Sequence, residues 1–274
     1  DVLLRRIHSR RMDAEAVALQ PDDEYLRELN EAYHHFFFHY TTTPLLVVET
    51  SQFDSDASDE ALDDLIKAGS NPTIGLLAQM QLGEIHVRLT AKAANEQAAQ
   101  ALIDPLAAEV RQRLGRALFG TDEVEYEQAI AQLIQQHQLT IAVAESGLNG
   151  GVGHQLGTAL AGSNHFVAAV TAHLPAAIEH LLDVPAGLLT RYGLVSPEVV
   201  AAMARGVRQR NATDLGLAVA GAERLHGSEE TVAYVALAYG QDALRTNEYR
   251  RVSSMRFARQ RIGRASLQTI YDHL

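Results

Sequence analysis

The sequence predicts an α/β protein, because helical and strand patterns alternate along most of its 274 residues. Residues 139–146, LTIAVAES, form a continuous apolar run that is typical of a buried parallel strand. Residues 125–138 before it carry apolar side chains at helical spacing, and further strand patterns at 215–221 and 231–239 follow after helices. These observations favour a sheet that is covered by helices, with a smaller α+β domain and a helical segment before it.

Composition restricts the classes of protein that this chain can be. The chain is 47% hydrophobic, which is enough for a sizeable core, and it contains no cysteine for disulfides or thiol chemistry. No apolar run approaches the roughly 18 residues of a membrane span, and the N-terminus has no signal-peptide pattern. The net charge of -11 argues against nucleic-acid binding. We therefore expect a cytoplasmic protein without membrane or nucleic-acid partners.

The pattern divides the chain into four parts. Residues 1–53 are mainly helical, with YLRELNEAYHHFFFHY at helical spacing, and end in a strand composition, PLLVVET. Residues 54–70 are acidic and read as a linker with one short helix. Residues 71–120 contain an alternating strand, EIHVRLTA, followed by a helix that ends near Gly115. Residues 121–274 are the largest α/β block.

Two blocks resemble the competence/damage-inducible protein family CinA. In residues 71–120 the resemblance is carried by NPTIGLLAQ, GEIHVRLTAKA and RLGRALFGTD, which look like the family's KH-like domain. In residues 121–274 it is carried by LTIAVAES, DLGLAVAG, TVAYVALA and the run 181–208, LLDVPAGLLTRYGLVSPEVVAAMARGVR. The second block looks like the nicotinamide-nucleotide amidohydrolase domain. The resemblance implies a pyridine or other mononucleotide as ligand, no cofactor, and a homo-oligomer.

Residues 1–53 resemble the C-terminal part of bacterial deoxynucleoside kinases instead. The family's arginine lid, R-x-x-x-R-G-R-x-x-E, is matched at Arg6, Arg10 and Glu15, while Met12 replaces its last arginine. The resemblance implies that Arg10 contacts phosphate, as arginine forks do, whereas the altered lid without a P-loop favours a solvated helix end. The kinase P-loop is missing, so this chain alone is not expected to phosphorylate a substrate. A kinase–CinA fusion without its front half is the resulting interpretation.

The stretch AVAESGLNGGVGHQL, residues 142–156, contains the candidate nucleophile Ser146. Hydrolysis of an amide needs a nucleophile, a base and donors that face the developing oxyanion. Gly150 and Gly151 at the expected helix start allow a phosphate or an oxyanion to approach closely. His173 is the candidate base, because imidazole is the common general base near neutral pH.

The sequence departs from the family's motifs in this region. The family has A-E-S-C-T-G-G and T-Y-x-N-x-x-K, in which Ser, Tyr and Lys are thought to form the catalytic set. Here AESGLNGG is one residue longer, and Thr171 is followed by no Tyr or Lys before Leu181. Of the family's G-I-A-G-P loop, Gly221 is kept. The sequence therefore favours a helix cap at Ser146, in a catalytically degenerate domain that binds a nucleotide or assembles the protein.

Two alternatives stay open at this point. The first is an active amidohydrolase that converts nicotinamide mononucleotide to nicotinate mononucleotide and ammonia, with Ser146 as nucleophile and His173 as base. The second is a regulatory C-terminal part of a deoxynucleoside kinase.

Three further motifs have structural interpretations. His35 and His39 have the i, i+4 spacing of a metal pair, but they lie in a packing helix without a third ligand, so no metal is expected. The KH-like block lacks the G-x-x-G loop that clamps RNA, which favours a structural spacer. The arginine-rich stretch 245–264 reads as the outward face of a strand and a helix.

Overall fold

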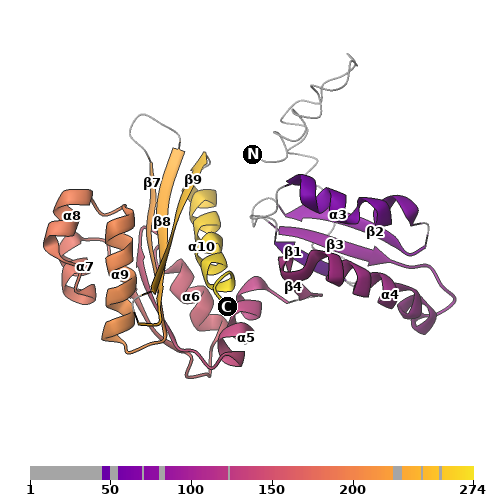
Figure 1. Cartoon of the computed structure of the whole chain (residues 1–274), viewed down its shortest axis with the longest axis horizontal. Helices are drawn as coiled ribbons and strands as arrows, with labels where there is room; N and C mark the ends of the chain where they lie inside the picture. Colours follow the sequence, from indigo (N-terminus) through magenta and orange to yellow (C-terminus); the bar gives the residue numbers. More distant parts are fainter. Residues whose placement is uncertain are drawn as a thin grey trace, which may run out of the picture. The chain divides into compact units, whose positions relative to one another are not determined.

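A computed structural model gives the arrangement of much of the chain (Figure 1). Residues 43–274 form one compact unit, within which the described residues build a four-stranded and a five-stranded sheet. The structure describes residues 45–49, 55–69, 71–79, 84–122, 124–224, 230–241, 243–252 and 255–274. The expected kinase-like helix, Arg10, His35 and His39 lie outside these residues.

The four-stranded sheet is antiparallel, in the order β2-β3-β1-β4. Its strands are β1 (Leu45–Glu49), β2 (Thr73–Gln79), β3 (Glu84–Thr90) and β4 (Leu118–Thr121). Its helices are α3 (Ser55–Ala68), α4 (Glu96–Leu114) and the 3-10 turn η1 (Gly115–Ala117). The alternation of EIHVRLTA puts Val87 and Leu89 of β3 into a core shared with α3 and α4. The strand and the helix end near Gly115 are as the sequence predicts.

This sheet begins earlier in the chain than the sequence pattern indicates. The strand in PLLVVET, which we placed with the kinase-like segment, is β1, and it pairs with β3 on one side and β4 on the other. The segment 54–70, expected to be a linker, holds the 14-residue helix α3, whose Leu62 is buried in the core. Local composition identifies a strand or a helix, but it does not reveal which distant strand will be its partner.

The five-stranded sheet has the order β6-β5-β7-β8-β9 (Figure 1). Its strands are β5 (Ile141–Ser146), β6 (Phe166–Thr171), β7 (Leu215–Arg224), β8 (Glu230–Tyr239) and β9 (Ala243–Val252). β5 lies between β6 and β7 and runs parallel to both, while β7, β8 and β9 are successive antiparallel neighbours. Its helices are α5 (Tyr126–Gln136), α6 (Gly151–Ala159), α7 (Pro175–Leu182), α8 (Ala186–Tyr192), α9 (Pro197–Arg210) and α10 (Met255–Tyr271).

Helices cover both faces of this sheet, which confirms the predicted α/β class (Figure 1). Side chains alternate along β5, so Ile141 and Val143 face α5, α6 and α10, whereas Ala142 and Ala144 face α7, α8 and α9. The second face is rich in alanine, and α9 approaches it closely. A Cβ on Gly216 of β7 would lie 2.3 Å from the carbonyl oxygen of Ala204 of α9. Among the described residues, no helix combines the length and apolar character that a membrane crossing requires.

Candidate functional site

Ser146 is the last residue of β5, at the carboxyl edge of the parallel strands. In open α/β sheets, ligands bind outside this edge, where neighbouring connections run to opposite faces. Ser146 pairs with Ala220 of β7, and it continues the face that carries Ala142 and Ala144. Its residue surface is only 3% exposed. Ser146 therefore lies at the end of the buried strand, as the sequence predicts, but it is almost fully buried.

The neighbours of Ser146 along the sheet are small and apolar. Ala220 lies on one side, and on the other lies Ala172, whose N–H donates to the carbonyl oxygen of Glu145 at 2.9 Å. The next residue in the row beyond Ala220 is Tyr234 of β8, two strand spacings or about 10 Å from Ser146. The sequence did not point to Tyr234. Its phenol lies on the same face as Ser146 only because of the register between β5, β7 and β8, which the local pattern does not show.

Glu145, next to Ser146, faces the opposite side of the sheet and caps α6. Its Oε1 accepts the N–H of Gly153 in the first turn of α6 at 2.6 Å. Glu145 is 1% exposed. Burial raises the pKa of this carboxyl group, and the backbone hydrogen bonds partly oppose the rise. The chain's own carboxylate thus occupies the helix start where Gly150 and Gly151 were expected to hold phosphate or an oxyanion.

The capping role predicted for Ser146 is therefore wrong. The N-cap of α6 is Gly150, which has a left-handed φ of 80°, and the carboxylate at the helix start belongs to Glu145. The physical reason is the strand alternation: β5 continues through Ser146, so adjacent side chains point to opposite faces.

Close backbone packing shapes the turn between β5 and α6. Gly147 has φ 91°, and a Cβ there would lie 1.8 Å from the carbonyl oxygen of Gly221. A Cβ on Gly221 would in turn lie 2.2 Å from the Cβ of Ala233. Arg259 of α10 holds the turn from outside, because its Nε donates to the carbonyl oxygen of Gly147 at 3.1 Å. Gly221, expected at the ligand, thus packs against the turn that follows Ser146.

The remaining predicted residues lie around this edge without forming a catalytic set. Thr171 ends β6, and its hydroxyl would lie 3.2 Å from a Cβ on Gly150. His173 is exposed in the connection from β6 to α7. Within the described residues, no hydrogen bond joins His173 to Ser146, and no group of three or more His, Asp or Glu residues could hold a metal.

The arginine-rich stretch is not the uniform outward face that we expected. Arg264 of α10 is 8% exposed and forms an ion pair with Glu84 of β3 at 2.8 Å. Its guanidinium carbon lies 3.1 Å from the ring centroid of Tyr126. The error arises because a long-range carboxylate and an aromatic ring make burial of an arginine possible, and neither is visible in the local pattern.

A helix-covered sheet with a serine at the end of its central parallel strand defines an α/β domain with a site at the carboxyl edge. Residues 123–274 match the CinA C-terminal domain, and residues 57–120 match the KH domain of the damage-inducible protein CinA. The chain belongs to the CinA family.

Individual relatives agree with this assignment. A CinA-like protein of Parasynechococcus marenigrum (strain WH8102) is 44% identical over 163 residues, which are 59% of this chain and 38% of that protein. A CinA-like protein of Rippkaea orientalis is 34% identical over 209 residues, 75% of this chain and 49% of that protein. The chain thus spans less than half the length of these relatives. The crystal structure of the competence/damage inducible protein CihA from Agrobacterium tumefaciens is 23% identical, with a TM-score of 0.48, over 53% of this chain and 94% of that one.

Proposed function

We propose that the C-terminal α/β domain binds a pyridine or related mononucleotide at the carboxyl edge of its parallel strands and does not hydrolyse it. The main support for the proposal is that Ser146 is buried among small apolar side chains. Its residue is 3% exposed, and its neighbours along the sheet are Ala172 and Ala220. A serine hydroxyl without an adjacent base is a weak nucleophile. In triad-like sets, loss of a partner typically reduces the rate by about 10³-fold or more.

The ligand class follows from family membership and from the retained geometry of the edge. The family resemblance implies nicotinamide mononucleotide or a similar ligand. The turn at Gly147 and Gly150, the hydroxyl of Thr171 and the cation of Arg259 all lie at this edge. Arg259 supplies the positive charge that a phosphorylated ligand needs. The α6 N-terminus contributes less, since the carboxylate of Glu145 already accepts the N–H of Gly153 there.

A second candidate is hydrolysis of nicotinamide mononucleotide. One observation favours it: Ser146 stands at the strand end in the retained AES sequence, with the phenol of Tyr234 in the same row. A regulatory role of this chain as the C-terminal part of a deoxynucleoside kinase depends on the resemblance of residues 1–53 to such kinases, and it stays a prediction.

The experiment combines binding and turnover. Calorimetric titration of the full chain with nicotinamide mononucleotide should show saturable binding, while a coupled assay should detect no ammonia above the protein-free rate. Ser146→Ala should keep the affinity within about tenfold, since loss of one uncharged hydrogen bond costs roughly 0.5–1.5 kcal/mol.

Ser163→Ala is the matched control, because this hydroxyl donates to Leu160 before β6, at the other end of the strand. Ammonia release that disappears in Ser146→Ala and persists in Ser163→Ala would establish the hydrolase instead. The absence of saturable binding by the unmodified chain would overturn the proposed ligand.

A further inference from the structure

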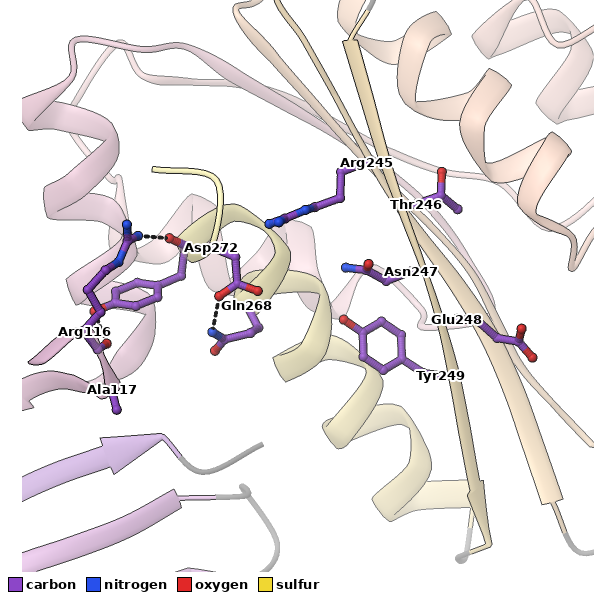
Figure 2. Close-up of a pocket in the computed structure, with 10 residues that line it drawn as sticks. Arg116, Ala117, Arg245, Thr246, Asn247, Glu248, Tyr249, Gln268 and Asp272 are labelled. Carbon is purple, nitrogen blue, oxygen red and sulfur yellow. Dashed lines mark hydrogen bonds between the residues drawn. The ribbon is translucent and has the colours of Figure 1, made fainter. Parts of the chain in front are cut away.

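We propose that a polar cleft between β9, the last turns of α10 and η1 binds a small phosphate monoester. The cleft has a volume of about 790 Å³ (Figure 2). Small-molecule sites typically fall between about 300 and 1,000 Å³. The inference does not depend on the proposed function of the Ser146 edge.

The side of β9 that faces α10 is polar where an apolar surface is expected. Arg245, Asn247 and Tyr249 alternate along β9 and point toward α10, while Thr246 and Glu248 point to the other side (Figure 2). Their partners in the same rows of β8 are all core residues: Leu237, Val235 and Ala233. Polar groups between a sheet and a helix reduce stability unless they are hydrogen-bonded. Their presence here indicates a requirement other than packing.

Hydrogen bonds hold the floor of the cleft in one arrangement. Asn247 Nδ2 donates to Thr269 Oγ1 at 3.2 Å, and the Tyr249 hydroxyl donates to the carbonyl oxygen of Ala265 at 3.2 Å. Gln268 is 7% exposed and donates to Asp272 Oδ1 at 2.7 Å. A preformed set of polar groups is what a small ligand needs, because little entropy is lost in ordering them.

Two arginines give the cleft its charge. Arg116 Nη2 donates to the carbonyl oxygen of Tyr271 at 2.9 Å, and the Tyr271 hydroxyl donates back to the carbonyl oxygen of Arg116 at 2.9 Å. A guanidinium has five N–H groups, so most of the donors of Arg116 remain for a ligand. Arg245 is exposed on β9 at the cleft. The guanidinium groups of both arginines suit the oxygens of a phosphate group.

The acidic side chains at the cleft are already engaged. Asp272 accepts from Gln268, and Glu248 forms an ion pair with Arg250 on the far side of β9. Asp272 keeps its negative charge, but Arg116 and Arg245 outnumber it once Glu248 is paired with Arg250, which leaves an excess of positive charge at the cleft in a chain whose net charge is -11. This contrast favours an anionic ligand, and the amide of Asn247 adds a partner for a sugar hydroxyl.

The cleft is separate from the Ser146 edge. Arg259 in the first part of α10 contacts the turn after Ser146, whereas Gln268 at the cleft follows nine residues later on the same helix. At 1.5 Å per residue, this separation is about 14 Å along the helix axis. A ligand in the cleft therefore does not depend on the hydroxyl of Ser146.

Titration of the full chain with ribose 5-phosphate tests the proposal, with inorganic phosphate and ribose as comparison probes. We expect saturable binding of ribose 5-phosphate, weaker binding of phosphate and none of ribose. Arg245→Gln should weaken the affinity at least tenfold, while Arg259→Gln, which removes the cation of the Ser146 edge, should leave it within twofold. Arg250→Gln is the matched control, because it removes the same charge from the other face of the same strand.

Three results would overturn the proposal. The first is no saturable binding by the unmodified chain. The second is equal affinity in Arg245→Gln and the unmodified chain, or an equal loss in Arg250→Gln, which would show a general charge effect. The third is loss of binding in Arg259→Gln, which would assign the ligand to the Ser146 edge. Arg245 is exposed, so circular dichroism should show an unchanged fold in its variant.

Discussion

At the scale of single residues, two neighbours in the sequence have unrelated roles. Glu145 caps α6 on one face of the sheet, and Ser146 meets alanine side chains on the other. The buried strand and its terminal serine could be predicted from LTIAVAES, because both follow from local composition. The role of Glu145 as the cap of α6 could not be predicted, because the choice between Glu145 and Ser146 depends on where β5 ends relative to the start of α6.

Glu145→Gln should change how stability depends on pH. Burial raises the pKa of Glu145 in the folded chain above its unfolded value. Between these two values the folded state binds more protons, so stability contributed by this group falls as pH rises through the folded pKa. Between pH 5 and pH 8, the free energy of unfolding of the variant should therefore rise relative to that of the unmodified chain. The rise should be about 1.4 kcal/mol for each unit by which the pKa of Glu145 is raised within this range. Urea unfolding at both pH values measures this.

Glu96→Gln controls for the change in net charge, since Glu96 is exposed in the first turn of α4. A difference that does not vary with pH in Glu145→Gln would contradict the burial argument.

Gly147→Ala should destabilise the turn after Ser146. The new Cβ would meet the carbonyl oxygen of Gly221 at 1.8 Å, and φ 91° is unfavourable for alanine. Strain and the forced backbone shift together should reduce the free energy of unfolding by roughly 2 kcal/mol or more. Gly151→Ala, where no heavy atom lies within 4 Å, should stay within about 1 kcal/mol. Thermal unfolding of both variants distinguishes them, and equal melting temperatures would refute the clash.

At the scale of elements, local chemistry accounts for the start of α9. In VSPEVV, Ser196 caps α9 by accepting the N–H of Val199 at 3.4 Å, and Pro197 is the first helical residue. The composition of EYRRVSSMRF, residues 248–257, predicts the last strand too late in the chain, since β9 is Ala243–Val252. Its start is fixed by the pairing of Ala243 with Tyr239 across the hairpin, which the local pattern does not encode.

Gly206→Ala tests how closely α9 packs. Its Cβ would meet the Leu182 carbonyl oxygen at 1.8 Å, so the helix must shift or lose contacts with the alanine face. Alanine normally stabilises a helix by about 0.8–1.0 kcal/mol over glycine, and here the sign should reverse to a loss of about 2 kcal/mol or more. Gly187→Ala on exposed α8, with no atom within 4 Å, should show the ordinary gain. Chemical unfolding compares them, and a gain at both positions would contradict close packing.

At the scale of the whole molecule, the sites combine residues that are far apart in the sequence. The α/β class and the family could be predicted, because they follow from the order of elements and from runs such as 181–208. The cleft could not, because Arg116, Arg245 and Gln268 meet only through the sheet register and the course of α10. The burial of Arg264 has the same origin, since its carboxylate partner is 180 positions away in Glu84.

Glu84→Gln should therefore destabilise both sheets together. Arg264 and Glu84 are each about 9% exposed at their side chains, and the arginine also lies over the rings of Tyr126 and Phe119. Removing one charge of a buried pair leaves the other without compensation, which typically costs about 3–5 kcal/mol. Loss of the exposed pair partner in Glu109→Gln on α4 should cost no more than about 1 kcal/mol. In urea unfolding followed by circular dichroism, the midpoint of Glu84→Gln should fall well below that of Glu109→Gln. Equal midpoints would mean that the aromatic rings, rather than the carboxylate, keep Arg264 stable in the core.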